Sequence, residues 1–437
     1  MLNVSTEAQR PACYTTDWKR TRPDLVVYLP STPAGQDGYN DHFLVEVTPS
    51  GDLLAMWTQG SYESSRDLRV VYSLSSDAGH TWSPPRVIDG FCDGSQPLAC
   101  FGFPVISRSG RIYCFYNKNL GFNDGWHYFT GVLRCSYSDD GGLNWVSGGM
   151  KLHFRRTRFD HPDPGVPCKW IVWQKPIRDS RGRSIVGFTR WSSMQVFPKP
   201  KEGWHLDSSC ELMRFENIDD GPAPRDIKIT WLPDQEGSVR VPCPIEPERS
   251  RGYSLCEEPS IVLLPDGRLF LVMRTVTGRV WYTVSDDDGR TWRPTEPLRY
   301  EDDGLEVLHP KSPCPIYVLQ DGRFLLFFHN HDGFSYGANG PWDMNARRPL
   351  FMALGEFRPR AHQPIWFSQA KEFCDTQGVG VGPQSLILLA MYSSLTENDG
   401  QRIFWYPDRK HFLLGRYIRD DFLADMEVPS ERTRSQR

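Results

Sequence analysis

The sequence of 437 residues has no apolar run near the roughly 20 residues that a membrane-spanning helix needs. From Met1 to Lys19 it also lacks the apolar segment that forms the centre of a secretory signal. The net charge is only −4, so the chain has no excess of basic residues for binding nucleic acid or an anionic membrane. These absences predict a cytoplasmic protein with no nucleic-acid partner and no membrane partner, and they leave its oligomeric state open.

The 11 cysteines show no Cys-x-x-Cys pair and no regular spacing. An odd, dispersed set is typical of reduced thiols in a cytosolic protein. Because no ligand pair has a zinc-like spacing, we expect no metal site and no cofactor.

The chain is rich in residues that favour short strands and turns, with 15 Trp, 17 Tyr, 24 Phe, 37 Gly and 35 Pro. Length alone would suggest two or three domains, but all-β architectures often run longer as one unit. We therefore expect a single all-β domain over residues 1–437. Its expected appendages are an N-terminal extension of about residues 1–22 and a polar C-terminal tail of about residues 425–437.

A short pattern recurs along the chain, in which a turn leads into an alternating apolar strand. Its six copies are Ser50–Asp52, Ser109–Arg111, Arg181–Arg183, Asp266–Arg268, Asp321–Arg323 and a weaker one without glycine, Pro407–Arg409. Glycine supplies the positive φ that tight hairpins require. Six spaced hairpins predict a six-bladed β-propeller, because radial repetition leaves only short, protected strand edges.

A second repeat, of the form S-x-D-x-G-x-T/N-W, occupies residues 75–82, 138–145 and 285–292. Its aspartate accepts hydrogen bonds from its own turn, its glycine permits the bend, and its tryptophan packs beneath. The three segments resemble the Asp-boxes of sialidases and related propellers, which lie on the outer rim on the side opposite the central site. This resemblance supports the fold and implies little about function.

The stretch from Cys256 to Trp292 resembles the fourth blade of glycoside hydrolase family 33 sialidases. In that family a glutamate opens the first strand of the blade, an Asp-Gly turn follows, and an arginine closes the second strand. Glu258 and Arg274 occupy these places. The resemblance implies that Glu258 activates a catalytic tyrosine and that Arg274 binds the carboxylate of the substrate.

Three further segments extend the resemblance. The segment from Asn345 is similar to the one that delivers the last carboxylate-binding arginine, which falls on Arg348, and Met391–Leu395 looks like the nucleophile motif, with Tyr392 as nucleophile. Glu63 lies where the family has its general acid/base. A neutral tyrosine paired with glutamate suits a sugar whose carboxylate would repel an anionic nucleophile. Arginine suits that carboxylate because its planar fork binds it bidentately.

The resemblance fails at the first inner strand, which in sialidases opens with Arg-Ile-Pro and supplies another carboxylate-binding arginine. Here Asp41 stands at that place, with His42 beside it. A like charge repels a substrate carboxylate, whereas a sugar hydroxyl at that point would suit Asp41. We expect both residues in substrate binding, together with Arg190 and His329, which end the inner strands of their blades much as Arg274 does.

The sequence favours an exo-acting glycoside hydrolase that removes a terminal sugar, either acidic or other than sialic acid, from a glycan or oligosaccharide through Tyr392, Glu258 and Glu63. A polysaccharide lyase remains an alternative, with His42 and Tyr392 moving a proton α to a uronate carboxylate that Arg274 neutralises. A third alternative is a non-catalytic sugar-binding propeller. The first two differ in their products, because only a lyase creates a double bond that absorbs ultraviolet light.

We expect little turnover of ordinary sialosides. Replacing an arginine by Asp41 removes a charged bidentate contact, and truncating one partner of such a pair costs about 2–5 kcal/mol. At about 1.4 kcal/mol per tenfold, kcat/KM on a fluorogenic sialoside should be at least about a hundredfold lower than on the enzyme's own sugar. The comparison needs a panel of rhamnosides, uronides and other α-glycosides. Sialidase-level turnover would show that another residue replaces the missing arginine.

Overall fold

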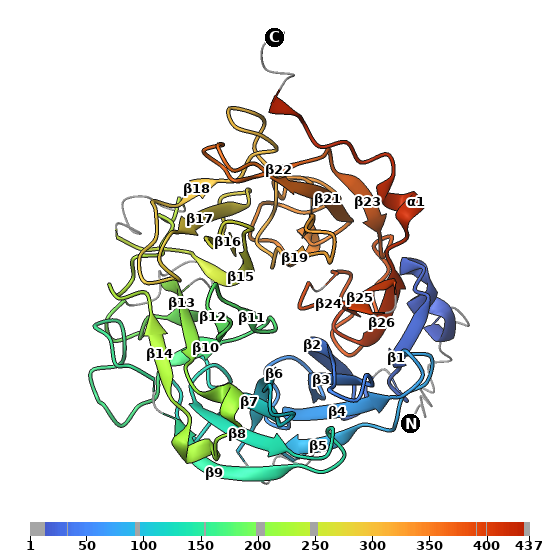
Figure 1. The fold of residues 1–437 in the computed structure, drawn as a ribbon. Helices are drawn as coiled ribbons and strands as arrows, with labels where there is room; N and C mark the ends of the chain where they lie inside the picture. Colours follow the sequence, from blue (N-terminus) through green and yellow to red (C-terminus); the bar gives the residue numbers. More distant parts are fainter. Residues whose placement is uncertain are drawn as a thin grey trace, which may run out of the picture.

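The structure is a computed structural model that describes residues 14–32, 34–91, 97–152, 154–197, 206–244, 252–389, 391–398 and 400–431. Residues 1–13 of the predicted N-terminal extension and residues 432–437 of the predicted tail lie outside the described residues. Six antiparallel sheets surround a central axis, with one edge strand of each sheet innermost (Figure 1). The prediction of an all-β, six-bladed propeller is therefore confirmed.

The sheets follow one another along the chain as blades 1 to 6. Blade 1 is β2 (Tyr39–Val47), β3 (Leu53–Gly60), β4 (Arg69–Ser75) and β5 (Arg86–Asp89). Blade 2 is β6 (Ala99–Ile106), β7 (Ile112–Lys118), β8 (Val132–Ser138) and β9 (Val146–Leu152). Blade 3 is β10 (Lys169–Ile171), β11 (Ile177–Arg178), β12 (Ser184–Trp191), β13 (Ser208–Phe215) and β14 (Ile229–Leu232).

Blade 4 is β15 (Glu257–Leu263), β16 (Leu269–Arg274), β17 (Trp281–Ser285) and β18 (Glu296–Pro297). Blade 5 is β19 (Ile316–Val318), β20 (Phe324–Phe328), β21 (Leu350–Phe357), β22 (Ile365–Phe367) and β23 (Lys371–Cys374). Blade 6 is β24 (Ser394–Asn398), β25 (Gln401–Asp408), β26 (Phe412–Tyr417) and β1 (Leu25–Tyr28).

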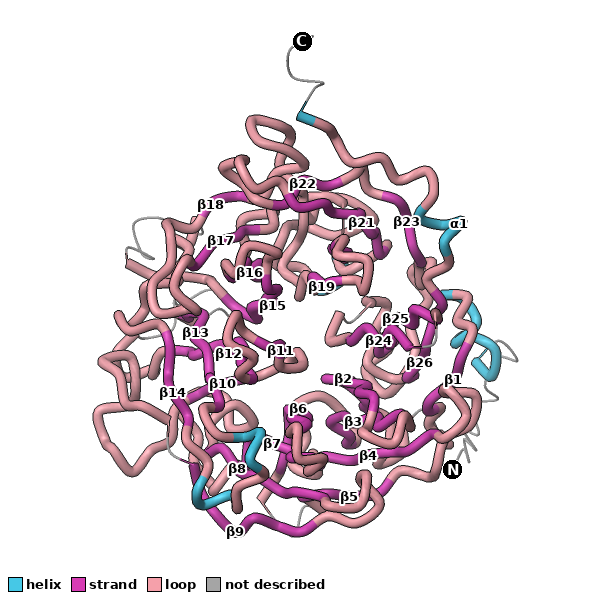
Figure 2. The backbone as a smooth tube through the Cα atoms, viewed as in Figure 1, coloured by secondary structure: helices cyan, strands magenta, loops and turns pink. Residues whose placement is uncertain are grey.

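Helical turns are short and lie towards the outside of the ring in the view of Figure 2 or in its loops. They are η1 (Tyr14–Thr21), η2 (Ile218–Asp220), η3 (Pro224–Asp226), η4 (Met344–Ala346) and α1 (Asp420–Leu423). No helix in the described ranges is long and apolar enough to span a bilayer.

Blade 6 combines strands from the two ends of the described chain. Its outer strand β1 pairs antiparallel with β26, and Leu25 faces Gly415 across the pair. This pairing closes the ring, because the last blade is completed by a strand that precedes the first blade.

The hydrophobic core is divided among the interfaces between blades. Each pair of neighbouring blades encloses one apolar cluster, and between blades 6 and 1 this cluster contains Trp405, Trp57 and Phe43. A seventh, aromatic cluster joins side chains from several blades near the axis, including Tyr39, Phe101, Trp173, Trp191 and Tyr392. Strands such as β3 and β12 are buried along their whole length because a blade lies on each side of them.

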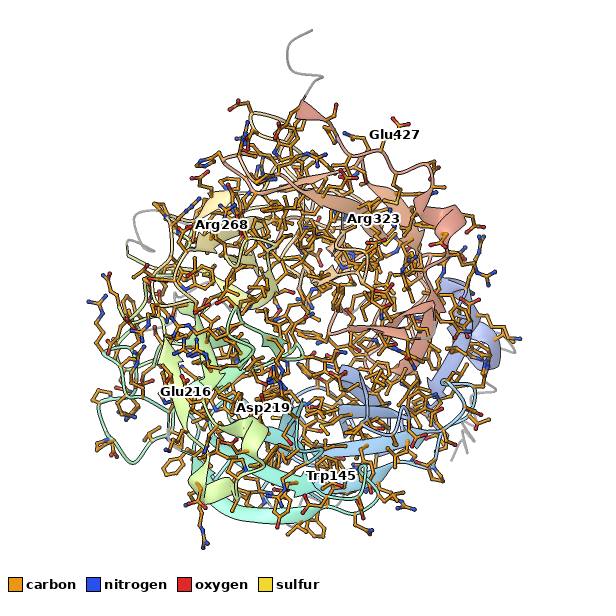
Figure 3. The ribbon with its side chains drawn as sticks, viewed as in Figure 1. Trp145, Glu216, Asp219, Arg268, Arg323 and Glu427 are labelled. Atoms are coloured by element: carbon orange, nitrogen blue, oxygen red, sulfur yellow. The ribbon has the colours of Figure 1, made fainter. Side chains whose placement is uncertain are left out.

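Five of the six predicted turns join an inner strand of a blade to the strand beside it, which in blade 3 means β11 to β12. Figure 3 labels Arg268 and Arg323 in two of these turns. The sixth prediction, Pro407–Arg409, is wrong. That hairpin joins β25 to β26, at the opposite end of blade 6, while β24 reaches β25 through Gly400. Arg409 and Lys410 both have positive φ, so this turn forms without glycine.

The three Ser-x-Asp-x-Gly turns have the same internal bonding. In the first, Asp77 accepts hydrogen bonds from the backbone of Thr81 and from Ser75, and Trp82 Nε1 donates to the carbonyl oxygen of Gly79 at 3.0 Å. The second and third, ending at Trp145 and Trp292, repeat this pattern. They join third strands to fourth strands, at the same end of the blades as the five predicted turns.

Trp405 should contribute strongly to the closure of the ring. It is fully buried, donates from Nε1 to Thr396 Oγ1 at 2.8 Å, and packs edge-on against Trp82. Trp405→Ala should lower the free energy of unfolding by about 3–5 kcal/mol, because it leaves a cavity between blades 6 and 1. Trp342→Ala is the control, since that side chain is 41% exposed. Equal denaturation midpoints for the two variants would contradict this account.

Candidate active site

The first strands of blades 1, 2 and 4 share a backbone distortion near their start. His42, Phe101 and Glu258 all have positive φ, of 52°, 59° and 49°, and strand pairing is irregular at each of these points. Such conformations cost energy for residues with a side chain and gather at functional sites. All three lie at the end of the blades opposite the glycine-containing turns that join β2 to β3, β6 to β7 and β15 to β16.

The distorted backbone is held in place by a threonine of the preceding blade. The amide of Phe101 donates to Thr58 Oγ1 at 2.9 Å, and the amide of Glu258 donates to Thr189 Oγ1 at 2.6 Å. The same device therefore appears in blades 2 and 4. It positions the side chains that the distorted strands carry towards the axis.

In blade 4 the distortion brings two consecutive acidic side chains to one arginine. Successive side chains of a regular strand point to opposite faces, yet Arg274 pairs with Glu257 at 3.3 Å and with Glu258 at 2.6 Å. Glu257 also accepts a hydrogen bond from Trp191 Nε1 and pairs with Lys311 at 3.2 Å. Arg274 is thus held between two carboxylates before any ligand binds.

Tyr392 and Glu258, the pair that the sequence predicts to react, are in direct contact. The Tyr392 hydroxyl donates to Glu258 Oε1 at 2.8 Å, and Arg274 Nη1 donates to the same hydroxyl at 3.2 Å. Burial raises the pKa of Tyr392 well above its ordinary value, and the charge of Glu258 raises that pKa further. The phenol is therefore neutral at rest and has a carboxylate in place to accept its proton.

Arg347 and Arg348 have different surroundings although they are neighbours in the chain. Arg348 pairs with Asp375 at 2.5 Å, stacks over Tyr336, and has no contact with Tyr392. Arg347 is buried and within electrostatic reach of Tyr392 and Glu258. The structure thus brings Arg347 near Tyr392 and Glu258, one residue before the predicted Arg348, which pairs with Asp375.

Arg347 has no acidic partner in the described part of the chain. Its Nε donates to the carbonyl oxygen of Lys311 at 3.0 Å, and no carboxylate there forms an ion pair with its guanidinium. Burial lowers the pKa of Arg347, and the nearby guanidinium of Arg274 lowers it further. A buried guanidinium in these surroundings is suited to bind an anion.

Lys410 joins the site from the β25–β26 hairpin, and no motif in the sequence pointed to it. Its Nζ lies 2.7 Å from Glu63 Oε1, 3.3 Å from Asp41 Oδ2 and 5.5 Å from the ring centre of Tyr392. The strained turn is held by buried Arg409, which bonds Asp408 and the carbonyl oxygen of Asp17. A lysine from blade 6 thus faces the acids of blade 1.

Asp41 and Glu63 share Lys410 but differ in protonation. Burial raises the pKa of Asp41 to about 6 against the opposing effect of Lys410. Burial acts in the same direction on Glu63, but Lys410, Arg347 and Arg274 together outweigh it and hold the pKa of Glu63 below its ordinary value. Glu63 is thus a carboxylate at neutral pH, whereas Asp41 takes up a proton in mildly acidic conditions.

His42 packs directly against Tyr392, with ring centres 4.4 Å apart, and against Phe101 on its other side. Burial and the charge of Lys410 lower the pKa of His42 well below its ordinary value. Within the described residues its Nδ1 has no hydrogen-bond partner. His42 is therefore a neutral ring beside the nucleophile candidate.

Two other predicted site residues have structural partners. Arg190 is fully buried and pairs with Glu211 at 2.7 Å and Asp160 at 2.8 Å, packed over Phe154 and Phe188 in the interface between blades 2 and 3. These contacts give Arg190 structural partners, and its role in substrate binding stays a prediction. His329 bonds the carbonyl oxygen of Pro349 through Nδ1 and stacks on His309, and in the described part of the chain its Nε2 has no partner.

The charged groups at the axis are balanced in number. The cations are Arg274, Lys311, Arg347 and Lys410, and the acids are Asp41, Glu63, Glu257 and Glu258. When Asp41 is protonated the cluster carries a net positive charge, which favours an anionic ligand. No group of three or more His, Cys, Asp or Glu in the described ranges is arranged to hold a metal, and the nine described cysteines are free thiols.

Residues 51–400 match the family model of the BNR repeat-like domain. The chain belongs to this family. No curated protein matches the sequence. The family assignment therefore rests on the domain model and on the fold.

Solved structures with the same fold include several sialidases. The NanB sialidase of Streptococcus pneumoniae is 12% identical with a TM-score of 0.60, over 92% of this chain and 71% of that protein. The leech intramolecular trans-sialidase is 14% identical with a TM-score of 0.57, over 91% and 70%. The intramolecular trans-sialidase of Ruminococcus gnavus is 14% identical with a TM-score of 0.56, over 92% and 98%. At such identities the likeness shows the fold.

The two buried arginines Arg347 and Arg190 should respond oppositely to removal of their charge. Arg190→Met leaves Glu211 and Asp160 buried without a partner, and should lower the free energy of unfolding by about 3–5 kcal/mol. Arg347→Met removes a buried charge that has no acidic partner, and should raise the free energy of unfolding by about 1 kcal/mol. Chemical denaturation measures both. A large loss of stability in Arg347→Met would assign Arg347 a structural role.

Proposed function

We propose that this protein is an exo-acting glycoside hydrolase that removes an anionic terminal sugar, with Tyr392 and Glu258 as its nucleophile pair. The observation that carries the proposal is the 2.8 Å hydrogen bond from Tyr392 to Glu258 beside a buried guanidinium, Arg347, that has no acidic partner in the described chain. The sialidase names of the structural relatives agree with this reaction class.

The first chemical step uses the contact between Tyr392 and Glu258. As the phenol oxygen attacks the anomeric carbon, its proton passes to Glu258, so a neutral nucleophile meets an anionic sugar without charge repulsion. Arg274 donates to the same oxygen at 3.2 Å and stabilises the charge that develops on it. A covalent glycosyl–tyrosine intermediate follows from this arrangement, and water then releases the sugar.

We propose an anionic sugar because Arg347 is the cation of the cluster that has no acidic partner in the described chain. Arg274 already pairs with Glu257 and Glu258, Lys311 pairs with Glu257, and Lys410 pairs with Asp41 and Glu63. A substrate carboxylate bound bidentately by Arg347 would give this guanidinium the anionic partner that it lacks. Asp41 stands at the place of the first sialidase arginine and supplies no cation there for a substrate carboxylate, which supports a sugar acid other than ordinary sialic acid.

A lyase acting on a uronate-containing glycan is the second candidate, favoured by the contact of His42 with Tyr392. Its base would have to remove a proton near neutral pH. The lowered pKa of His42 makes it a weak base, which favours the hydrolase. Lyase products absorb in the ultraviolet and hydrolase products do not, so one spectrum of the products separates the two reactions.

Tyr392→Phe should lower kcat/KM on a cleaved 4-methylumbelliferyl glycoside by about 10³-fold or more, because it removes the nucleophilic oxygen. Tyr317→Phe is the matched control. Tyr317 is a half-buried tyrosine whose hydroxyl bonds Ser393, and its loss should change kcat/KM less than about threefold. A slow fluorinated glycosyl substrate should add one sugar mass to the Tyr392 peptide of the wild-type protein. Labelling of another residue would refute the assignment of Tyr392.

A further inference from the structure

Glu63 is poorly placed to hold a proton at rest. Its carboxylate is 2.7 Å from the ammonium of Lys410, and its side chain is 26% exposed at the edge of the site. Burial raises the pKa of Glu63, but the positive charges of Lys410, Arg347 and Arg274 lower it more. The pKa of Glu63 therefore lies below its ordinary value. A general acid must carry a proton before the leaving group departs. Glu63 is held in the opposite state.

Asp41 has the environment that Glu63 lacks. It is fully buried, its Oδ2 lies 3.3 Å from Lys410 and accepts from Tyr39 at 3.3 Å, and in the described chain its Oδ1 has no hydrogen-bond partner. A buried carboxylate oxygen without a partner is unfavourable as an anion and much less so as an acid. Burial raises the pKa of Tyr392, and the charge of Asp41 acts in the same direction. Lys410 Nζ lies 3.3 Å from Asp41 Oδ2 and 5.5 Å from the ring centre of Tyr392.

We infer that Asp41, rather than Glu63, protonates the oxygen of the leaving group. Lys410 keeps Glu63 ionised, so that Asp41 is the acid that carries the proton. This assignment rests on the hydrolase function proposed above. Asp41 is the general acid and base of the reaction. Lys410 and Glu63 are positioning residues, because they act through Asp41.

The reaction balances with these groups. In the first step the proton of Asp41 passes to the glycosidic oxygen as its bond to the anomeric carbon breaks, while the Tyr392 oxygen bonds that carbon and gives its proton to Glu258. In the second step water gives a proton to the Asp41 carboxylate and its oxygen bonds the anomeric carbon. The Tyr392–carbon bond breaks, and Glu258 returns the proton to Tyr392. Both acids regain their starting states.

The negative charge of the substrate favours the protonated form of Asp41. An anionic sugar adds a negative charge to a cluster whose acids and cations are otherwise equal in number, and a nearby negative charge favours the protonated form of a carboxyl. The pKa of Asp41 should therefore be higher in the complex than in the free enzyme. The groups that face Asp41 from its own strand and from neighbouring elements are Tyr39, His42, Glu63, Tyr392 and Lys410.

The first experiment compares leaving groups. Asp41→Asn should lower kcat/KM by about 10²–10³-fold on a glycoside with an alcohol or sugar leaving group, and by less than about tenfold on the 2,4-dinitrophenyl glycoside, which needs no protonation. Azide should restore turnover of the dinitrophenyl substrate. Glu63→Gln should lower both rates by a similar factor, and Asp375→Asn, which removes a carboxylate paired with Arg348 instead, should leave both within about threefold.

The second experiment follows the alkaline limb of the pH profile. Activity needs protonated Asp41, so kcat/KM should fall as pH rises above about 6. The fall in kcat should come at a higher pH, because the bound anion raises the pKa of Asp41 in the complex. Lys410→Met should move the limb to higher pH, since the ammonium lowers the pKa of Asp41. Glu63→Gln should move it to lower pH, since the Glu63 charge raises that pKa. Lys410→Arg, which keeps the charge, should restore the wild-type limb.

The outcomes separate this inference from the function on which it rests. If the wild-type protein cleaves no glycoside of the panel, the proposed function fails. If it cleaves one but Asp41→Asn loses the same factor on both leaving groups, or Glu63→Gln alone removes the alkaline limb, then Glu63 or another group is the acid and the assignment of Asp41 is wrong. Should Lys410→Met not fold, the leaving-group comparison still decides.

Discussion

The pairing of β1 with β26 is the constraint on which the arrangement of this molecule depends. A propeller has no stable partial ring, because each blade needs an apolar neighbour on both sides. Closing the ring brings blade 6 against blade 1, so that Tyr392 and Lys410 meet His42 and Asp41. The amide of Phe43 donates to the carbonyl oxygen of Tyr392 at 3.1 Å across the same seam. The charged cluster at the axis is thus a product of closure.

The site combines strained backbone with buried charge, and the two features support each other. Left-handed residues at His42 and Glu258 place successive side chains on the same side, which lets several acids converge. Converging acids need cations nearby, since an isolated buried charge is costly. Arg274, Lys311 and Lys410 supply them from three different blades. In the described chain Arg347 forms no ion pair with an acid, and this unpaired guanidinium is the feature that a ligand best explains.

Much of the fold followed from sequence because hairpin turns with glycine and alternating strands repeat visibly. The contact of Tyr392 with Glu258 also followed, through a resemblance that spans two distant segments. The error at Pro407–Arg409 has a physical cause. A turn with two left-handed residues normally contains glycine, and here Arg409 and Lys410 adopt it because buried contacts of Arg409 hold them. Lys410 was missed for the same reason.

Local sequence also leaves the choice between Arg347 and Arg348 undecided. The two residues are identical and adjacent, and the difference arises from which one meets Asp375 and which one turns towards Tyr392. Glu257 beside Glu258 presents the same difficulty, because no glycine marks the distortion that brings both to Arg274. Partners far apart in the chain decide these orientations, and spacing within one segment carries no record of them.

The outer strand of blade 6 also bears on how the protein is made. During synthesis β1 leaves the ribosome first, but its partner β26 follows only after every other blade. Until then β1 is an unpaired strand with buried-type residues such as Leu25 and Val27, open to pairing with other chains. The charged cluster at the axis is likewise assembled last, because Lys410 belongs to the β25–β26 hairpin. A nascent chain that stops short of β26 would carry most of the blades without the closed ring that brings blade 6 against blade 1.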